Sequence, residues 1–462
     1  MHGLCVKAPS LAAAPRFHRS PVSGSFAFQP QGVPIAPQSR AYTAARVLLI
    51  GLLIGAPVMF GATEVWAWVS LGILTCLALL LWVIGSLRLP TLHLIWSPLY
   101  IPIASFIALA FLQYWAGFTL DRSETREALV LMCADVVLFF LAVQLFGLVE
   151  TESLCRLGLT VIIFTGSLAL FAILQFVSGQ SRGAVTSASP DFFFGRYGDP
   201  DHYAGLMEML IPVGVLYILG VQEKIRTSAR ALLVCAVTIA FASLLMSGSR
   251  GGLISALVEV LIVLVILRRR SQPIERRALA GAVLAGTASL LLFFWLDPGW
   301  VSPRLGLLLK VRSPGFAAWT RSRKSWTSDS LRMLREHPVL GVGLGNFETA
   351  FPPYQSLPSD LWIHHTHDDY VEALSETGVA GGVLILSALG MFIWLAFRNL
   401  DKRLKSDVGW IRLGSAIGCC GLLVHSFFDY NLHVPANAAW FSVLGGLSVV
   451  GEISSRPLEL SN

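Results

Sequence analysis

Two histidines and two aspartates stand almost side by side in the segment His365-Thr366-His367-Asp368-Asp369-Tyr370-Val371. Imidazole titrates near neutral pH, so a histidine positioned by a neighbouring carboxylate suits general-base catalysis. The same residue types can ligate zinc, but that use needs further ligands from a scaffold that this short segment lacks. We therefore expect one histidine of the segment to act as a base, and no metal.

A second polar segment, Ser247-Gly248-Ser249-Arg250-Gly251-Gly252, separates two apolar runs and has an arginine at its tip. The glycines permit a tight turn, and the amides at the start of the next helix could join Arg250 in holding an anion. An ordinary hairpin with a snorkelling arginine at the membrane surface explains the same residues.

A third polar segment, Phe194–Gly205, leads from a loop into an apolar run. Arg196 could bind a phosphate, while Asp199, Asp201 and His202 could orient a sugar or a partner side chain. A polar turn in which one aspartate caps the following helix is the alternative interpretation.

The longest polar interval contains a basic stretch, Arg321–Glu336, whose apolar residues recur at the spacing of an amphipathic helix. We expect this helix to lie at the membrane surface, where a solvated basic face explains its charges. The glycines that follow resemble a phosphate-binding loop superficially. No strand precedes them and no Lys-Ser/Thr follows, so they do not predict a nucleotide site.

These segments belong to a chain of 462 residues that is 55% hydrophobic and 13% charged, with a mean hydropathy of +0.67. Such a balance excludes an ordinary soluble domain and indicates an integral membrane protein. Apolar runs of roughly 17–25 residues recur along it, and because they are continuously apolar they predict helices rather than barrel strands. Much of the net charge of +6 lies in short loops, where it sets orientation, so we expect no nucleic-acid partner.

We expect an all-α integral membrane protein with about twelve transmembrane helices and one long extracytoplasmic loop that contains short helices. The expected spans lie near residues 46–60, 65–86, 97–116, 128–149, 157–177, 203–221, 231–246, 252–267, 278–296, 372–397, 411–429 and 433–451. The expected regions are a disordered cytoplasmic tail (1–45), the spans before the loop (46–296), a long periplasmic loop (297–371), the last spans (372–452) and a cytoplasmic tail (453–462).

Alternate loops between these spans differ in charge. One set is basic and should face the cytoplasm by the positive-inside rule. Its residues are Arg88, Arg156, Lys224, Arg226, Arg230, Arg268, Arg269, Arg270, Arg276, Arg277, Arg398, Lys402, Arg403 and Lys405. The other set contains every unusual polar segment, in residues 60–64, 117–127, 178–202, 247–251, 297–369 and 430–432. A common face predicts that these segments share one site outside the cytoplasm.

The chain resembles the O-antigen ligase and polymerase superfamily, polytopic enzymes that act on polyprenyl-linked glycans outside the cytoplasmic membrane. The resemblance runs from Phe60-Gly61-Ala62 to the segment His425–Ala438. Its most specific elements are the Ser249-Arg250-Gly251 turn, the run Asp329–Phe347 with its glycines, and the cluster His365–Val371 continuing into Glu376-Thr377-Gly378.

This resemblance implies roles for individual residues. Arg250 and Arg323, with Arg321 as a rival of Arg323, would hold the donor pyrophosphate, and Arg196 would be a third phosphate contact. His367 would be the base that activates the acceptor hydroxyl, with His365 and Asp368 beside it. No cofactor is implied, because fixed guanidinium groups can meet the charge on the leaving pyrophosphate.

The chain departs from the family pattern in one repeated way. Asp368, Asp199 and Asp201 stand where the family pattern has asparagine. A carboxylate next to His367 would raise the histidine pKa and strengthen it as a base, or would signal a different acceptor.

The expected function is therefore glycan transfer from a polyprenyl pyrophosphate carrier to an acceptor hydroxyl by metal-independent inverting displacement, in the manner of an O-antigen ligase. The expected setting is the lipid bilayer of the bacterial inner membrane, with the site facing the periplasm. The acceptor stays open between lipid A core, a second lipid-linked glycan as in an O-antigen or exopolysaccharide polymerase, and a protein hydroxyl as in a protein O-oligosaccharyltransferase.

Two functions from other classes remain as alternatives. A polysaccharide transporter or flippase would also need many spans, but transporters place ionisable groups in mid-membrane, where this chain has few: Asp135, Glu208 and Glu259. A zinc hydrolase would use the His365–Asp368 cluster as ligands and would lose activity with chelators.

Overall fold

The computed structural model describes residues 39–89, 92–147, 151–178, 194–220, 226–268, 314–357, 362–450 and 456–458. All of them belong to one compact unit, Ile35–Asn462. The predicted tails at 1–38 and 459–462, the predicted span at 278–296 and the first part of the predicted long loop lie outside the described residues.

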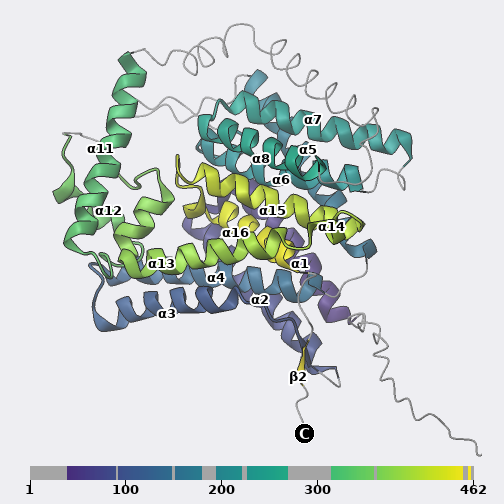
Figure 1. The fold of residues 1–462 in the computed structure, drawn as a ribbon, viewed down its shortest axis with the longest axis horizontal. Coiled ribbons are helices and arrows are strands. Elements are labelled where there is room, and N and C mark those ends of the chain that lie inside the picture. Colours follow the sequence, from purple (N-terminus) through teal and green to yellow (C-terminus); the bar gives the residue numbers. More distant parts are fainter. Residues whose placement is uncertain are drawn as a thin grey trace, which may run out of the picture. The chain divides into compact units, whose positions relative to one another are not determined.

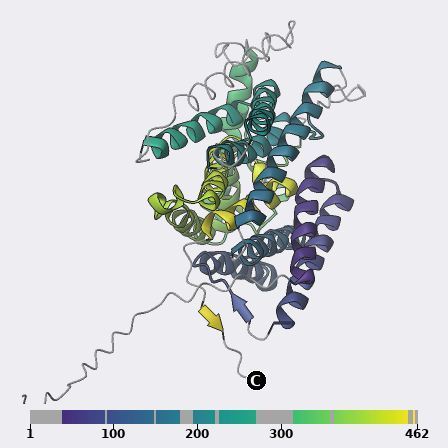
Figure 2. The ribbon, with the colours of Figure 1, turned by 90° about the vertical axis from the view of Figure 1, so that its right-hand side faces the viewer.

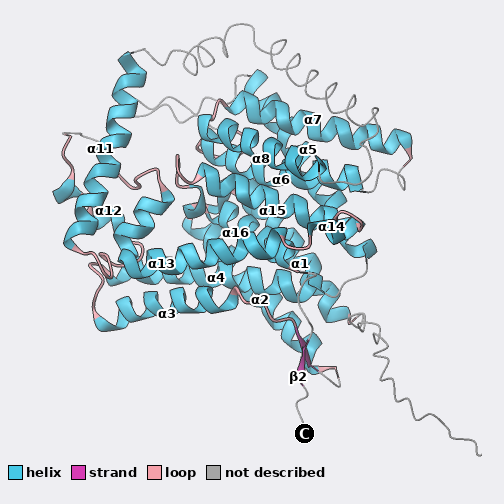
Figure 3. Cartoon of the chain, viewed as in Figure 1, coloured by secondary structure: helices cyan, strands magenta, loops and turns pink. Residues whose placement is uncertain are grey.

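The described residues are almost entirely helical, which confirms the predicted all-α membrane fold (Figure 1, Figure 3). The long helices are α1 (Arg40–Val58), α2 (Val65–Leu87), α3 (Tyr100–Ala116), α4 (Arg122–Gly147), α5 (Thr151–Val177), α6 (Pro200–Gly220), α7 (Thr227–Ser247), α8 (Arg250–Arg268), α11 (Pro314–Glu336), α13 (Asp369–Phe397), α15 (Asp407–His425) and α16 (Pro435–Val449). Short helical elements are η1 (Phe60–Ala62), α12 (Phe347–Ala350), η2 (Pro352–Tyr354), α14 (Leu400–Arg403) and η3 (Asn431–His433).

The only strands in the described residues are β1 (Leu92–Leu94) and β2 (Arg456–Leu458), which pair antiparallel (Figure 2).

Each predicted span within the described residues coincides with a helix. A continuously apolar segment in lipid can hydrogen-bond all its backbone N–H and C=O groups within itself only as a helix. Nine of the described helices are long and apolar enough to cross a membrane. Two further elements at predicted spans are shorter, α3 with 17 residues and α16 with 15. The first helix begins at Arg40, within the segment that the sequence predicts as a tail.

Helices α6 and α15 form the interior of the bundle. In each, 78% of the most apolar stretch is buried, against 28% for α2 and α13, which leave their apolar side chains open to lipid. Glycines let the two central helices approach closely: a Cβ at Gly418 would lie 2.1 Å from the Met209 carbonyl oxygen. Close backbone approach through small residues is a usual way to pack helices where no hydrophobic effect drives association.

The polar loops that the sequence places on one face lie together at one end of the bundle. Gly61 packs against Tyr197 and Val434, and Gly251 packs against the ring of His425. At the same end the Asn346 amide bonds the hydroxyls of Thr119 and Thr125. Likewise Asn437 reaches the His202 carbonyl, and Arg323 reaches the Phe428 carbonyl. These contacts join five of the predicted polar loops to one another or to residues 425–437, the segment that contains the sixth.

Helix α13 is broken at Gly378, whose φ of 65° and ψ of −168° are not helical. The glycine-containing segment that precedes α12 fills the break. Pro338 and Val339 carbonyls accept from the amides of residues 379 and 380, while the amides of residues 342 and 343 donate to carbonyls 375 and 376. The glycine-containing segment thus supplies the backbone hydrogen bonds that the broken helix lacks, which is not the role of a nucleotide-binding loop. These bonds hold residues 369–377, which carry part of the site.

The amphipathic helix predicted at Arg321–Glu336 forms the larger part of α11, which stands at the left of Figure 1 beside α12. Its buried Met333 packs with Val342, Phe347, Phe351 and Ile363 in a small apolar cluster of its own. Trp326 packs against this cluster, so α11 is held over the polar end of the bundle by apolar contacts as well as by charge.

Candidate active site

The centre of the polar end is a histidine–carboxylate pair. His367 Nδ1 lies 2.7 Å from Asp429 Oδ1, and Asp429 is buried while the His367 side chain is 22% exposed. A carboxylate only accepts hydrogen bonds, so Nδ1 carries the proton and Nε2 is left as the basic nitrogen. His367 is thus oriented and keeps one nitrogen for proton transfer.

Rings on two sides fix the plane of His367. Trp326 of α11 stacks on it with centroids 5.7 Å apart and planes 21° apart, and Tyr430 meets it edge-on at 4.8 Å. The backbone of His367 is in the left-handed region, with φ 55°. Packing against Trp326 and the bond to Asp429 hold this uncommon conformation in place.

Asp368 does not supply the carboxylate that the sequence leads one to expect beside His367. Its Oδ1 accepts from the amides of Tyr370 and Val371, both at 3.1 Å, and so caps the N-terminus of α13. Burial raises the pKa of Asp368, and these two backbone bonds act against the rise. The carboxylate that contacts His367 belongs to Asp429, which lies 62 residues further along the chain.

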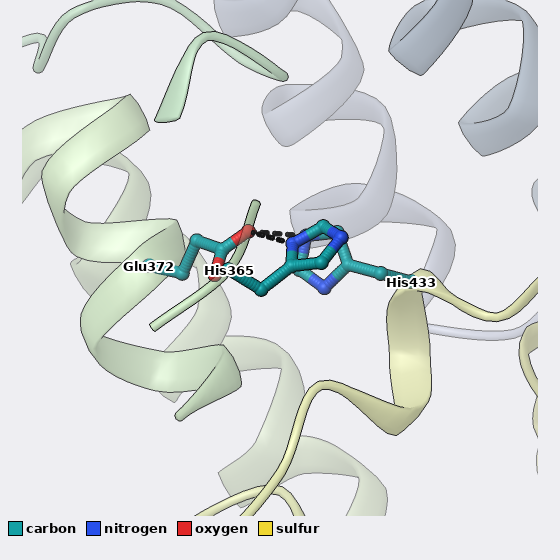
Figure 4. Close-up of side chains that lie close together, drawn as sticks. All are labelled: His365, Glu372 and His433. Atoms are coloured by element: carbon teal, nitrogen blue, oxygen red, sulfur yellow. Dashed lines mark hydrogen bonds and ion pairs between the residues drawn. The ribbon is translucent and has the colours of Figure 1, made fainter. Parts of the chain in front are cut away.

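His365 belongs to a separate cluster with Glu372 and His433 (Figure 4). His365 Nδ1 lies 2.6 Å from Glu372 Oε1, and His433 Nε2 lies 3.4 Å from the same oxygen. Burial acts to lower the pKa of His433, but the carboxylates of Glu372 and Asp369 outweigh it and raise the pKa to about 10. The ring of Tyr430 stacks on His365 at 4.1 Å and separates this cluster from His367.

Arg323 of α11 reaches the same end of the bundle, where its Nη1 donates to the Phe428 carbonyl at 3.1 Å. Burial lowers the pKa of this guanidinium, while the charges of Asp429, Asp201 and Asp199 raise it. Arg321, its rival from the sequence, is exposed. The structure therefore brings Arg323, and not Arg321, next to the carbonyl that adjoins Asp429.

Arg250 is the first residue of α8, and the Ser249 hydroxyl caps that helix by accepting from the Gly252 amide at 3.1 Å. The next residue, Gly251, leaves no room for a side chain: a Cβ there would lie 2.3 Å from the His425 ring. His425 in turn accepts the Asp429 amide on its carbonyl and pairs with Glu208 at 3.1 Å. The N-terminus of α8 thus packs against His425, the residue whose carbonyl accepts the Asp429 amide.

Arg196 lies at the first loop. Its Nε donates to the Val58 carbonyl at 3.2 Å, and its guanidinium stands 4.6 Å from the centre of the Phe60 ring. These contacts tie the third polar segment, whose backbone φ is 74° at Arg196, to the first loop. The contacts of Arg196 are thus with the end of α1 and with η1, whereas Arg323 reaches the residue next to Asp429.

The acidic residues of the third polar segment also approach Asp429. Asp199, His202 and Asp429 bring possible metal-ligand atoms within 4.8 Å of one another, and His202 Nε2 faces Asp429 Oδ2 at 3.9 Å. Burial and the nearby Asp201 raise the pKa of Asp199 to about 6, while His202 acts to lower it. Asp199 Oδ1 accepts from the Asp201 amide at 2.8 Å, the capping contact that the sequence offered as an alternative.

Residues 235–386 match the family model described as O-Antigen ligase. The chain carries a domain of the O-antigen ligase superfamily. The resemblance inferred from the motifs is thereby confirmed for this part of the chain, which includes Arg250, Arg323 and His367. No match was found among the curated proteins.

Four residues that contact the candidate site were given no role by the sequence analysis: Glu372, His425, Asp429 and His433. Each lies near a motif, yet pairs with a residue far from it in the chain, as Glu208 and His425 do across 217 positions. An ionisable residue within an apolar run was the one sign in the sequence of such buried pairs. Glu208, the partner of His425, is such a residue.

Proposed function

We propose that this protein transfers a glycan from a polyprenyl pyrophosphate carrier to an acceptor hydroxyl, as an O-antigen ligase does, at the periplasmic face of the bacterial inner membrane. The observation that carries the proposal is the His367–Asp429 pair: it leaves one nitrogen of a partly exposed imidazole for a substrate proton, and Arg323 bonds the carbonyl of Phe428, which adjoins Asp429. Membership of the superfamily supports a membrane glycosyltransferase.

The proposed reaction is a single displacement. His367 Nε2 takes the proton of the acceptor hydroxyl while the hydroxyl oxygen attacks the anomeric carbon of the donor sugar. The bond between that carbon and the pyrophosphate oxygen breaks from the opposite face, so the configuration inverts. Arg250 and Arg323 meet the charge on the leaving pyrophosphate, and Asp429 steadies the imidazolium that forms on His367.

A nearly apolar hollow supports a lipid-linked donor. It has a volume of about 450 Å³ between α8, α13 and α15. Its walls include Val258, Ile262, Leu374, Leu386 and Phe427, and Tyr370 lies at the end nearest the site. Tyr370 is three residues from His367, and its hydroxyl donates to the Leu423 carbonyl at 2.7 Å. A polyprenyl tail in this hollow would lie against Phe427, the neighbour of the residue whose carbonyl Arg323 bonds.

Transfer by purified protein from a lipid-linked donor tests the proposal. His367→Ala should lower the rate by about 10²–10⁴-fold through loss of the base. Arg250→Ala and Arg323→Ala should each lower it by about 10²–10³-fold through loss of charge stabilisation. His337→Ala and Arg335→Ala are matched controls, because both side chains are exposed at the end of α11, and their rates should equal wild type. Near-normal transfer by His367→Ala or Arg250→Ala would contradict the proposal.

Asp429→Asn distinguishes positioning from general damage. Asp429 orients His367 and does not hold the donor, so kcat should fall while the KM for donor stays unchanged. Arg323→Ala should raise the donor KM as well. Gel analysis of the product identifies the acceptor class: one transfer per acceptor indicates a ligase, whereas a ladder made without lipid A core indicates a polymerase.

A further inference from the structure

The cluster of His365, Glu372 and His433 has the composition and spacing of a metal site. Its three side chains come from separate places: the segment before α13, the first turn of α13 and η3. Each offers one ligand atom, and these atoms lie within 4.8 Å of one another. Figure 4 shows the Glu372 carboxylate directed at both imidazole rings.

Neighbouring groups already fix the orientation of two of these side chains. Glu372 Oε2 accepts from the Thr366 amide at 2.8 Å, which leaves Oε1 facing the histidines. His433 Nδ1 lies 2.8 Å from Asp369 Oδ1, which leaves Nε2 facing Glu372. A carboxylate behind a histidine is the usual support of a metal-bound imidazole, because it sets the tautomer and makes the ligand nitrogen more basic.

The buried carboxylate of Glu372 needs a positive partner, which a metal ion that displaces the proton of His433 can supply in place of the imidazolium. Glu372 is 1% exposed, and a buried carboxylate is costly unless positive charge accompanies it. Two imidazoles and one carboxylate suit zinc or cobalt rather than magnesium or calcium, which take oxygen ligands. His365 and His433 keep 27% and 33% of their side-chain surface exposed, which gives an ion a path in and leaves a coordination position for water.

We propose that His365, Glu372 and His433 bind a divalent transition-metal ion such as Zn²⁺, with Asp369 supporting His433. The ion joins the segment before α13 to the turn before α16, the two segments that carry His367 and Asp429. The ring of Tyr430 lies between the cluster and His367, so the ion has a holding role and the transfer reaction needs no step through it.

Metal binding to the full-length protein in detergent tests this site. The purified protein is freed of metal with a chelator and titrated with Zn²⁺, Co²⁺ and Mg²⁺. We expect one equivalent of Zn²⁺ or Co²⁺, a visible absorption band for Co²⁺ with imidazole ligands, and no binding of Mg²⁺. Glu372→Gln and His433→Ala should each weaken Zn²⁺ binding at least about tenfold.

His364→Ala is the matched control. His364 Nδ1 contacts Glu348 Oε1 at 2.9 Å, a histidine–carboxylate pair with no third ligand at that place among the described residues. Its loss should leave Zn²⁺ binding unchanged. Zn²⁺ should also raise the melting temperature of wild type and of His364→Ala but not of Glu372→Gln, because an ion that binds only the folded state stabilises it.

Wild-type protein that takes up no equivalent of Zn²⁺ or Co²⁺, or variants that bind as wild type does, would overturn the site. If one variant does not fold, the other variant decides, read by the intense visible absorption of four-coordinate cobalt, which hexaaqua cobalt lacks. All of these measurements omit glycan substrates, so their outcome is separate from that of the transfer assay.

Discussion

His367 has a backbone conformation that residues with side chains seldom adopt, and its neighbour explains why the chain maintains it. With φ at 55°, His367 turns the chain so that Asp368 can cap α13 while the imidazole points the other way, to Asp429. One aspartate therefore starts the helix and a distant one orients the histidine. Strained residues held by their surroundings are common where geometry serves catalysis.

Asp199 gives the molecule a pH-dependent stability that a single substitution should remove. Burial and Asp201 raise its pKa from 3.8 to about 6 in the folded protein. Between these values the folded state keeps a proton that the unfolded state has lost, so the contribution of Asp199 to stability is full below pH 3.8 and falls until about pH 6. Asp199→Asn should therefore raise the melting temperature at pH 7 and leave it nearly unchanged at pH 4.

Thermal unfolding of detergent-solubilised protein, followed by intrinsic fluorescence, measures this difference. The asparagine oxygen can still accept from the Asp201 amide, so the capping contact survives. Asp401→Asn, a change at an exposed position at the other end of the bundle, should show no such pH-dependent gain. Equal effects of Asp199→Asn at both pH values would contradict the expectation.

At this scale the sequence proposed His367 and Arg323 as site residues but did not predict their partners. His367 and Arg323 stand in recognisable motifs, whereas Asp429 acts on a histidine 62 positions earlier, and no local pattern encodes that pairing. Asp368 was the wrong carboxylate for contact with His367 because adjacency in the chain does not place two side chains together when the backbone turns between them.

Among the elements, α13 decides how the site is built. Its break at Gly378 separates a membrane portion from the short segment that begins at Asp369, and the amides and carbonyls freed by the break pair with residues 338–343. Gln113 of α3 adds bonds to the Leu340 and Glu376 carbonyls. Non-helical backbone at this depth is tolerated because protein groups satisfy it.

Gly378→Ala should destabilise the protein strongly. An added Cβ would lie 2.3 Å from the Val339 carbonyl carbon, and the φ and ψ of this position are open almost only to glycine. Strained backbone alone costs about 1–3 kcal/mol, so the melting temperature should fall by several degrees. Gly390→Ala in the same helix meets nothing within 4 Å and should leave the melting temperature unchanged or slightly higher.

Circular dichroism during heating distinguishes the two variants. If Gly378→Ala has the melting temperature and the helix content of wild type, the break in α13 does not depend on glycine at this position.

At the scale of the molecule, the two ends of the described helix bundle carry different polar groups. The polar loops meet at the end where α15 finishes with His425, while Arg403 at the opposite end donates to the carbonyls of Ser448 and Leu395. The fold was predictable at this scale because apolar length and loop charge are properties of composition. The break in α13 was not, since it depends on a segment that arrives from another part of the chain.

Reporter fusions test the proposed orientation. Alkaline phosphatase joined after Gln355 should be active, because this position lies at the polar end and the enzyme needs the periplasm to form its disulfides. The same reporter after Lys405 should be inactive, and a green fluorescent protein at that position should fluoresce. The reverse pattern would place the site in the cytoplasm.

The 62 positions between His367 and Asp429 also have a consequence for biosynthesis. A ribosome that has just released α13 into the membrane has made the histidine and both arginines, yet the carboxylate that orients the histidine is still unmade. The site is therefore completed only when α15 has inserted and the turn after it has folded back. A truncated chain that ends before this turn would carry every motif of the matched domain, and it would lack an oriented base.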